Sequence, residues 1–280
     1  MAAAYAEARR DARLRRERAK KARRSVDVDE AAVVALAPCP SLVRYADAFV
    51  SEAEAAALPE QLRALAGWRQ MPRGRRVLSV GGTPHPGGAW AEPLPECLSG
   101  LAARVARFFA DGRAPDQALV NDYEAGGGID PHRDGPCYES TAVVVSLESS
   151  ARLDFFADGA RTGSVLLRPR SLVAFSGAAY ADAAHGISAA RSDAVDELVR
   201  NRREAAARLG EEVPRAATRL SVTFRRFADV ARTLDDVDAT LLSDADRAEL
   251  KRRRAWWAAS ISEKDAATIS PPQLHRQLPW

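Results

Sequence analysis

The second half of the chain consists of short apolar runs with a period of two, separated by turn residues. Closely spaced strands without intervening helices favour an antiparallel sandwich or jelly roll. The stretch 192–217 is charged and rich in Ala, Glu and Arg, and it predicts a partly helical insertion before the last strand. The predicted strands are 118–123, 141–147, 152–157, 164–167, 171–175, 185–190 and 219–227.

The first half of the chain mixes helical and extended patterns. Residues 41–50 predict a strand entering a turn, and a helix follows from Ser51 to about residue 66, with acidic residues in its first turn. A short strand begins at residue 77 and leads into a Gly/Pro loop, and residues 98–109 have helical apolar spacing. These helices are expected to flank a sheet, which gives an α+β fold with a mainly β core.

Composition narrows the class of protein. The chain has 280 residues, 46% of them hydrophobic, which is enough for one catalytic domain with extensions. No apolar run approaches the roughly 20 residues needed to cross a bilayer, and the N-terminus has no apolar signal-peptide core, so a soluble intracellular protein is expected. Cys39, Cys97 and Cys137 are far apart and odd in number, which indicates neither a disulfide framework nor a CxxC zinc site.

Charge is concentrated at the N-terminus. Residues 1–24 hold ten Lys/Arg and three acidic residues, so the other 256 residues carry a net charge of about −4 within a total of +3. Such a terminus can bind nucleic acid, act as a nuclear address or remain a solvated helical tail. The acidic residues argue against a cleaved organelle-targeting peptide, although the Ala/Arg richness leaves that alternative open.

A candidate metal site lies in the segment Asn121-Asp-Tyr-Glu-Ala-Gly-Gly-Gly-Ile-Asp-Pro-His-Arg-Asp134. His132 and Asp134 are two residues apart, so on an extended segment they point to the same side. Two imidazoles and one carboxylate occupy one face of an octahedral iron and leave three positions open. His185, which begins a β run, is the favoured third ligand. Alternatively, His132 and Asp134 form a polar surface pair and His185 is a core histidine.

Alternate polar residues on the last predicted strand form a second constellation. Arg219, Ser221, Thr223 and Arg225 share one face of this strand. If that face is buried, the arginines need an anion, and a dicarboxylate cosubstrate supplies one through bidentate pairing. Asn121 and Tyr123 could add hydrogen bonds from another strand. The alternative is a solvent-facing edge strand.

Taken in order, these motifs resemble the AlkB family of Fe(II)/2-oxoglutarate dioxygenases over roughly residues 40–229. The resemblance implies a double-stranded β-helix that uses Fe(II), 2-oxoglutarate and O₂. It also implies iron ligands His132, Asp134 and His185, and cosubstrate contacts from Asn121, Tyr123, Arg219, Ser221, Thr223 and Arg225. The segments that look most like the sixth AlkB-homologue branch are Gly81-Gly-Thr-Pro-His-Pro, His132-Arg-Asp-Gly-Pro-Cys-Tyr138, Leu153-Asp-Phe-Phe, Arg168-Pro-Arg-Ser-Leu and His185-Gly-Ile-Ser-Ala-Ala-Arg191.

Two residues depart from the family pattern. Ser221 stands where the family has Asn, which shortens one hydrogen-bonding side chain but leaves both arginines. Pro136 stands where base-repairing members carry an acidic residue, so recognition of an alkylated base is not implied. The expected organisation is a basic, helical or disordered tail at 1–30, the AlkB-like domain at 40–229 with its dioxygenase core at about 116–229, and a helical extension at 230–280.

The expected activity is oxidation, as demethylation, of a methylated nucleic acid or protein, with release of succinate and CO₂. A protein side-chain hydroxylase using the same cofactors is the first alternative, and a nucleic-acid-binding module with a silent iron site is the second. We expect RNA, DNA or a methylated protein as partner, no membrane, a monomer, and a nuclear or cytoplasmic location.

Several aromatic and histidine residues are weaker candidates. Tyr138, Trp90 and Tyr180 could stack on a flat substrate, but core packing is the simpler interpretation. His85 between two prolines suits a fixed loop, His275 lies in a Pro-rich terminus, and Trp256-Trp257 is expected to pack onto the domain.

Overall fold

A computed structural model describes residues 32–34, 43–85, 88–90, 92–135, 137–228, 230, 231, 244, 247 and 248. These residues belong to two compact units. The first unit comprises Met1–Leu78, Val120–Asp134 and Ser140–Thr223, and the second comprises Ser79–Leu119, Gly135–Glu139 and Phe224–Trp280. The predicted tail at 1–30 and most of the predicted extension at 230–280 lie outside the described residues.

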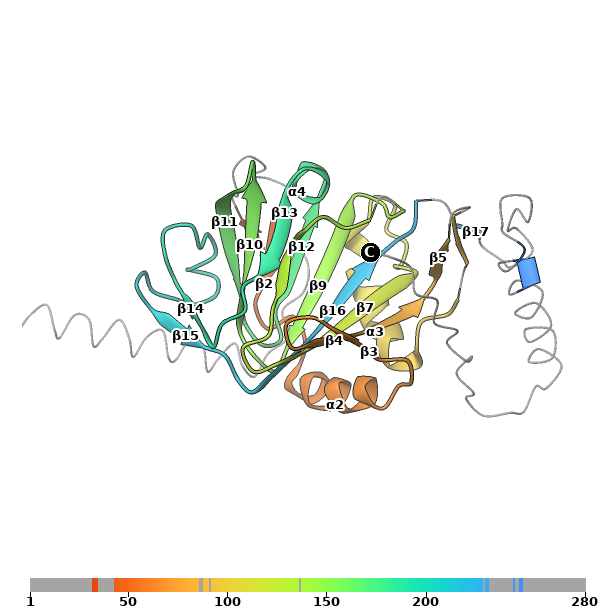
Figure 1. Cartoon of the computed structure of the whole chain (residues 1–280), viewed down its shortest axis with the longest axis horizontal. Coiled ribbons are helices and arrows are strands. Elements are labelled where there is room, and N and C mark those ends of the chain that lie inside the picture. Colours follow the sequence, from red (N-terminus) through yellow and green to blue (C-terminus); the bar gives the residue numbers. More distant parts are fainter. Residues whose placement is uncertain are drawn as a thin grey trace, which may run out of the picture. The chain divides into compact units, whose positions relative to one another are not determined.

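The larger sheet of the structure has eight strands in the order β1-β2-β12-β9-β16-β7-β4-β3 (Figure 1). The ladders β1–β2, β2–β12, β12–β9 and β3–β4 are all antiparallel. Strand β16 lies between β9 and β7 and is therefore a central strand. The strands are β1 (Ala32–Val34), β2 (Val43–Ala46), β3 (Arg69–Met71), β4 (Arg75–Gly81), β7 (Gln117–Glu124), β9 (Thr141–Leu147), β12 (Leu172–Ser176) and β16 (Thr218–Arg225).

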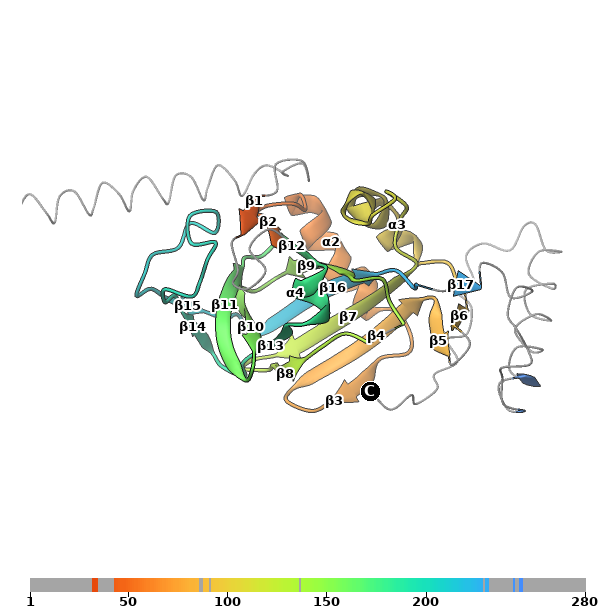
Figure 2. The same ribbon diagram turned by 90° about the horizontal axis from the view of Figure 1, so that it is seen from above.

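A smaller antiparallel sheet has the order β11-β10-β13-β8. It is formed by β8 (Ile129–His132), β10 (Ala151–Ala157), β11 (Ala160–Leu167) and β13 (Ala184–Ile187). Within the first unit the two sheets face each other (Figure 2), because Phe155 of β10 and Phe175 of β12 meet edge to face with ring centroids 5.5 Å apart. Both rings are buried. This mainly β core with flanking helices confirms the predicted fold class.

The first long helix begins where the sequence predicts. In α2 (Glu52–Arg63), the Ser51 side chain accepts from the Glu54 backbone N–H, and the Glu54 carboxylate accepts from the Ser51 N–H at 2.8 Å. This capping box satisfies two backbone donors at the start of the helix. The helix ends at Arg63, three residues before the predicted end. Its buried Leu58 and Leu62 side chains pack into the first unit.

The second unit contains a helix and a group of ion pairs. Helix α3 (Glu96–Val105) continues into the 3₁₀ turn η2 (Ala106–Phe108), as the apolar spacing predicted. Arg226, directly after β16, is ion-paired with both Asp111 and Glu139. The unit also holds β5 (Thr83–His85), β6 (Gly88–Trp90) and β17 (Val230–Ala231), in which β6 pairs with both others.

The stretch 192–217 differs from the prediction, because it forms a small β-ladder and turns. Strands β14 (Ser192–Ala194) and β15 (Glu212–Pro214) pair antiparallel. Between them, the buried Asn201 amide bonds to both the backbone N–H and C=O of Leu166, at 2.8 and 2.9 Å. Because β11 is an edge strand, this side chain replaces the missing neighbour of its backbone. That tertiary bonding overrides the helical propensity of the composition.

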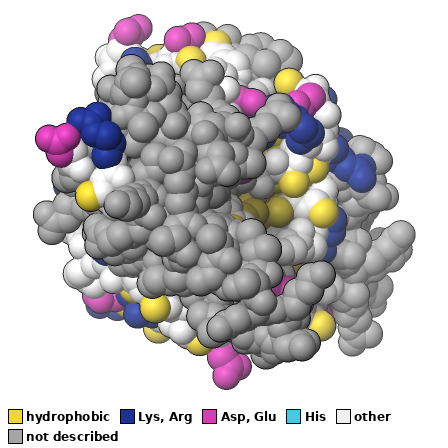
Figure 3. All heavy atoms as spheres, turned by 90° about the vertical axis from the view of Figure 1, so that its right-hand side faces the viewer, with side chains coloured by type: hydrophobic (Ala, Val, Ile, Leu, Met, Phe, Trp, Pro, Cys, Tyr) yellow, Lys and Arg dark blue, Asp and Glu magenta, His cyan; other side chains and the backbone are white. Residues whose placement is uncertain are grey.

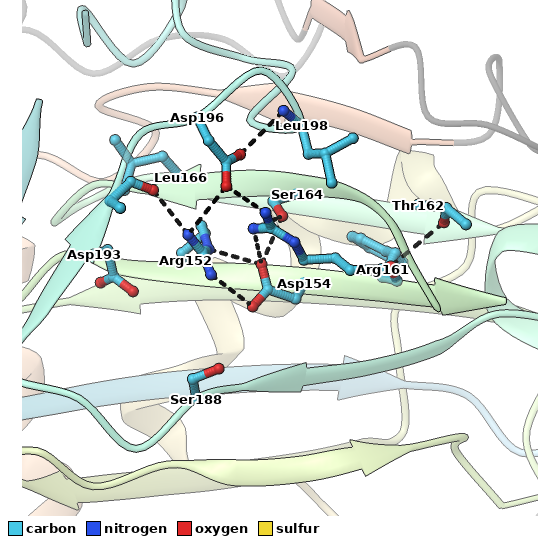
Figure 4. A network of polar contacts seen from close by, with 12 residues as sticks. Arg152, Asp154, Arg161, Thr162, Ser164, Leu166, Ser188, Asp193, Asp196 and Leu198 are labelled. Carbon is cyan, nitrogen blue, oxygen red and sulfur yellow. Dashed lines mark hydrogen bonds and ion pairs between the residues drawn. The ribbon is translucent and has the colours of Figure 1, made fainter. Parts of the chain in front are cut away.

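A polar network joins this stretch to the smaller sheet (Figure 4). The buried carboxylate of Asp154 accepts from Arg152 at 2.8 Å and from the Ser164 hydroxyl at 2.6 Å. Arg161 pairs with both Asp154 and Asp196. Asp154 belongs to the Leu153-Asp-Phe-Phe segment, and these bonds give its carboxylate a structural role.

No helix among the described residues is long and apolar enough to cross a membrane. On the face shown in Figure 3, acidic and basic side chains are both present among the coloured residues, with hydrophobic side chains between them. This view therefore gives no single-sign charge pattern from which a partner could be inferred.

Candidate active site

Three potential metal ligands meet on the smaller sheet. His132 ends β8, His185 lies on β13, and the two residues are direct register partners in the β8–β13 ladder. Asp134 follows two residues after His132. One ligand atom from each of these three side chains lies within 4.8 Å of the others. The structure thus brings the three predicted ligands together.

The surroundings of the two histidines orient them as ligands. His132 Nδ1 lies 2.9 Å from the backbone oxygen of Asp130, a bond that requires a proton on Nδ1 and leaves Nε2 as the basic nitrogen. The ring of His185 is buried against Phe175 and Phe155, at centroid distances of 4.9 and 6.3 Å. This side of the triad is therefore apolar and shielded from water.

Arg219 is a buried cation whose hydrogen bonds among the described residues go to hydroxyl groups. Its residue is 5% exposed, its Nη2 donates to Ser146 Oγ at 2.6 Å, and its guanidinium lies 5.2 Å from the Tyr123 ring centroid. Its Nε has no hydrogen-bond partner among the described residues. Burial lowers the pKa of Arg219 below its ordinary value, although Tyr123 opposes that shift. A guanidinium desolvated in this way needs an anion to offset the cost.

The other residues predicted to bind a cosubstrate are also buried. Asn121 and Tyr123 lie on β7, next to β16, and are 5% and 6% exposed. Because β16 is central and buried on both faces, the edge-strand alternative is wrong. Ser221 lies 3.4 Å from Arg219 Nη1 and is the weaker of its two hydroxyl partners. Thr223 and Arg225 complete the buried polar residues of this strand.

Arg75 is a polar residue of this region that the sequence interpretation missed. It is 9% exposed, and its Nη1 donates to Asn121 Oδ1 at 2.7 Å. Burial lowers the pKa of Arg75, again opposed by Tyr123. In the sequence, Arg75 belongs to the basic segment Arg73-Gly-Arg-Arg76, which is typical of an exposed turn. The only sequence signal that Arg75 faces inward is its position two residues before Val77, on the same face of the strand.

A small cavity links the triad strand to the arginine strand. It is lined by Tyr123, Ile187, Arg215 and Arg219, among other residues of the first unit. Ile187 lies two residues after His185 on β13. Arg215 is already paired bidentately with the buried Asp193, at 2.6 and 2.7 Å, so Arg219 is the lining arginine without a carboxylate partner among the described residues.

Two of the weaker candidates stack on phenylalanine rings, and the others, or their side chains, lie outside the described residues. Tyr180 is buried and stacks on Phe175, and Tyr138 stacks on Phe227 with centroids 4.9 Å apart. Tyr180 therefore packs in the core, whereas Tyr138 is half-buried, with the Arg225 guanidinium 5.2 Å from its ring centroid. Pro136, His275 and Trp256-Trp257 lie outside the described residues, as do the side chains of His85 and Trp90.

The chain is similar to several known proteins. The family model of the 2OG-Fe(II) oxygenase superfamily matches residues 42–225. The Probable RNA/DNA demethylase ALKBH6 from Danio rerio is 33% identical over 209 residues, which are 69% of this chain and 88% of that protein. The tRNA (carboxymethyluridine(34)-5-O)-methyltransferase ALKBH8 from Mus musculus is 33% identical over 40% of this chain but only 16% of its own length. The solved structure of OsALKBH1 has a TM-score of 0.42 and 17% identity, and covers 66% of this chain and 96% of that one.

The chain therefore belongs to the 2OG-Fe(II) oxygenase superfamily, and it is a dioxygenase that uses Fe(II), 2-oxoglutarate and O₂. Within that class it is of the AlkB type, and its similarity to zebrafish ALKBH6 extends over most of both chains. The resemblance drawn from the separated motifs is confirmed.

Proposed function

We propose that His132, Asp134 and His185 hold the catalytic Fe(II). Two imidazoles and one carboxylate are the donor set that suits this ion in oxygenases and leaves positions for cosubstrate and O₂. The observation that carries the proposal is the convergence of the three ligand atoms within 4.8 Å on two paired strands. The hydrogen bond from His132 Nδ1 to Asp130 O supports it, because it directs the other ring nitrogen to the metal.

The buried polar residues of β7 and β16 are proposed to bind 2-oxoglutarate. Arg219 would pair with a carboxylate, and Tyr123, Ser221 and Thr223 would donate hydroxyl hydrogen bonds. Asn121 would add an amide donor, and Arg225 a second guanidinium. Support comes from the burial of Arg219, whose hydrogen bonds among the described residues go to hydroxyl groups and not to a carboxylate.

With its cofactors bound, this site supplies a hydroxylation in which 2-oxoglutarate is converted to succinate and CO₂. The protein contributes orientation and exclusion of water, through buried rings such as Phe155 and Phe175 beside His185. When the oxidised carbon is an N-methyl group, the hydroxymethyl product breaks its C–N bond and releases formaldehyde. Hydroxylation of such a substrate is then a demethylation.

The proposed substrate is a methylated nucleic acid. The zebrafish relative is named as an RNA/DNA demethylase, and the mouse relative as a tRNA-modifying enzyme. The ten basic residues of the first 24 provide a charge that nucleic acid attracts. Pro136 replaces an acidic residue of the base-repairing members, so we propose that this enzyme recognises its target by other contacts.

The test is mass spectrometry of methylated RNA, DNA and peptide pools incubated with the full chain, Fe(II), ascorbate and 2-oxoglutarate. Loss of a methyl mark from RNA or DNA, with equal amounts of formaldehyde and succinate, is expected. Asp134→Ala should abolish the change, whereas Asp158→Asn, at an exposed turn, should not. Hydroxylated peptides without formaldehyde would instead establish a protein hydroxylase, and no succinate in any pool would contradict the metal assignment.

A further inference from the structure

Arg75 is a buried cation that the proposed ligand set does not use. It lies at the start of β4, and its Nε has no hydrogen-bond partner among the described residues. Its Nη1 donates to the Asn121 amide oxygen at 2.7 Å. A buried guanidinium beside a neutral amide is costly, because burial favours its uncharged form. Such a residue requires an explanation beyond packing.

The register of β4 against β7 places Arg75 on the inner face. The Glu124 N–H donates to Gly74 O at 2.8 Å, and Arg76 pairs with Asp122, also at 2.8 Å. Since side chains alternate along both strands, Arg76 and Asp122 occupy one face, and Arg75 shares the other with Asn121 and Tyr123. Arg75 thus belongs to the same buried cluster as Arg219, which lies over the Tyr123 ring.

The bond to Arg75 fixes which way the Asn121 amide points. A guanidinium has five N–H donors and no acceptor, so only the amide oxygen of Asn121 can face it. The amide nitrogen, with its two N–H groups, must then point away from Arg75. Without this bond, the amide could turn over and present its oxygen to an anionic ligand, which would repel it.

We propose that Arg75 is a positioning residue for the cosubstrate: it holds the Asn121 amide so that Nδ2 donates to an oxygen of 2-oxoglutarate. The inference rests on the proposed function, which places Asn121 in the cosubstrate site. The positioning role also explains why a charged side chain is buried at position 75. When a dianion fills the site, the cation lies one hydrogen bond behind the amide and polarises it toward the ligand.

The experiment is a thermodynamic cycle on 2-oxoglutarate binding to the full chain loaded with Mn(II), measured by isothermal titration calorimetry. Arg75→Met and Asn121→Ala should each weaken binding about tenfold or more, which is typical for loss of a hydrogen bond to a charged group. If Arg75 acts through Asn121, the double variant should bind no more weakly than Asn121→Ala. The affinity for Mn(II) itself should not change in any variant.

A matched control comes from the opposite face of the same strand. Arg76→Met removes a cation from β4 but leaves the Asn121 amide bond intact, so 2-oxoglutarate affinity should be unchanged. If Arg75→Met fails to fold, Asn121→Asp provides the second measurement. It keeps an acceptor for Arg75 but has no N–H to donate, so it should lose at least as much affinity as Asn121→Ala.

The alternatives give different results. Additive losses in the double variant would mean that Arg75 contacts the cosubstrate itself, and unchanged binding by Arg75→Met would mean that it only packs. Normal binding by Asn121→Asp would show that the amide donor is not needed. Each of these outcomes overturns the inference but leaves the proposed function intact, whereas absence of 2-oxoglutarate binding to the wild-type protein overturns both.

Discussion

His132 and His185 face each other as register partners across β8 and β13, with ring centroids 4.5 Å apart. The residue after His185 is Gly186, at an irregularity of the ladder. A Cβ on Gly186 would lie 2.9 Å from both Ile129 O and Pro131 N, a contact that real Cβ atoms do not make. Because those atoms belong to the β8 backbone, the spacing of the two histidines depends on this glycine.

Gly186→Ala is therefore expected to push β8 from β13 and weaken metal binding about tenfold or more, since ligands displaced by even a fraction of an ångström lose coordination geometry. Mn(II) titration followed by electron paramagnetic resonance measures this directly. Gly100→Ala is the control, because Gly100 lies within helix α3 and a Cβ there meets nothing within 4 Å. Equal Mn(II) affinity in the Gly186 variant and the wild type would show that the triad does not depend on this close approach.

Arg219→Met separates a binding role from a structural one. The wild-type protein is expected to gain thermal stability when Mn(II) and 2-oxoglutarate are added together, and the variant should lose the part due to 2-oxoglutarate. Without cosubstrate, the free energy of unfolding of the variant should be at most about 1 kcal/mol below that of the wild type. The reason is that an apolar side chain replaces a buried cation that has no carboxylate partner among the described residues. Circular dichroism melts and denaturant titration provide both quantities. A loss of several kcal/mol in the absence of cosubstrate would show that Arg219 holds the fold.

The sequence predicts the strands well where alternation is strict. The bounds of β9 and β12 agree with the predicted ranges to within one residue, because apolar side chains repeat at every second position, as in Val143, Val145 and Leu147 of β9. It also predicts the triad, since His132 and Asp134 are close in sequence. By contrast, β8 was not predicted as a strand in its own right, because Gly, Asp and Pro surround its few apolar residues.

The contribution of Arg75 could not be predicted, because its meaning depends on a neighbouring strand. A basic residue beside Arg73 and Arg76 is typical of an exposed turn, and only the pairing of β4 with β7 shows that Arg75 faces inward. The same holds for Asn201, whose side chain replaces a backbone partner of β11. In both cases a polar side chain gains its role from tertiary contacts that sequence periodicity does not contain.

Asp116 should make the protein less stable as pH rises. Burial raises the pKa of its carboxyl to about 6, although the Phe227 N–H, which donates to it at 3.1 Å, opposes this. A raised folded-state pKa gives stability that is fully present below the unfolded pKa of about 3.9 and is lost as pH rises through about 6. Asp116→Asn keeps the acceptor and removes the charge. Urea titrations should therefore find the variant more stable than wild type at pH 7.5 and equal at pH 4, and a constant difference would contradict the assignment.

Asp122 should show the opposite dependence on pH. Burial alone raises the pKa of its carboxyl, but hydrogen bonds from Arg63 and Arg76 outweigh burial and lower it. Its stabilisation is thus present above the unfolded pKa of about 3.9 and is lost as pH falls below that value. Because Arg63 holds the end of α2 to Asp122 by two bonds, of 2.8 and 3.0 Å, Asp122→Ala should lower the free energy of unfolding at pH 7 by about 2 kcal/mol.

That loss should be smaller than for a fully isolated buried pair, since Arg63 keeps Glu148 and Arg76 keeps the face of Trp68. Asp130→Ala is the matched control for stability: it removes the same charge from an exposed pair with Arg73 and should cost no more than about 0.5 kcal/mol. Urea titrations at pH 7 and pH 3 decide the matter. The gap between Asp122→Ala and wild type must shrink at the lower pH, and a gap that stays the same there would mean that Asp122 acts by packing and not by its charge.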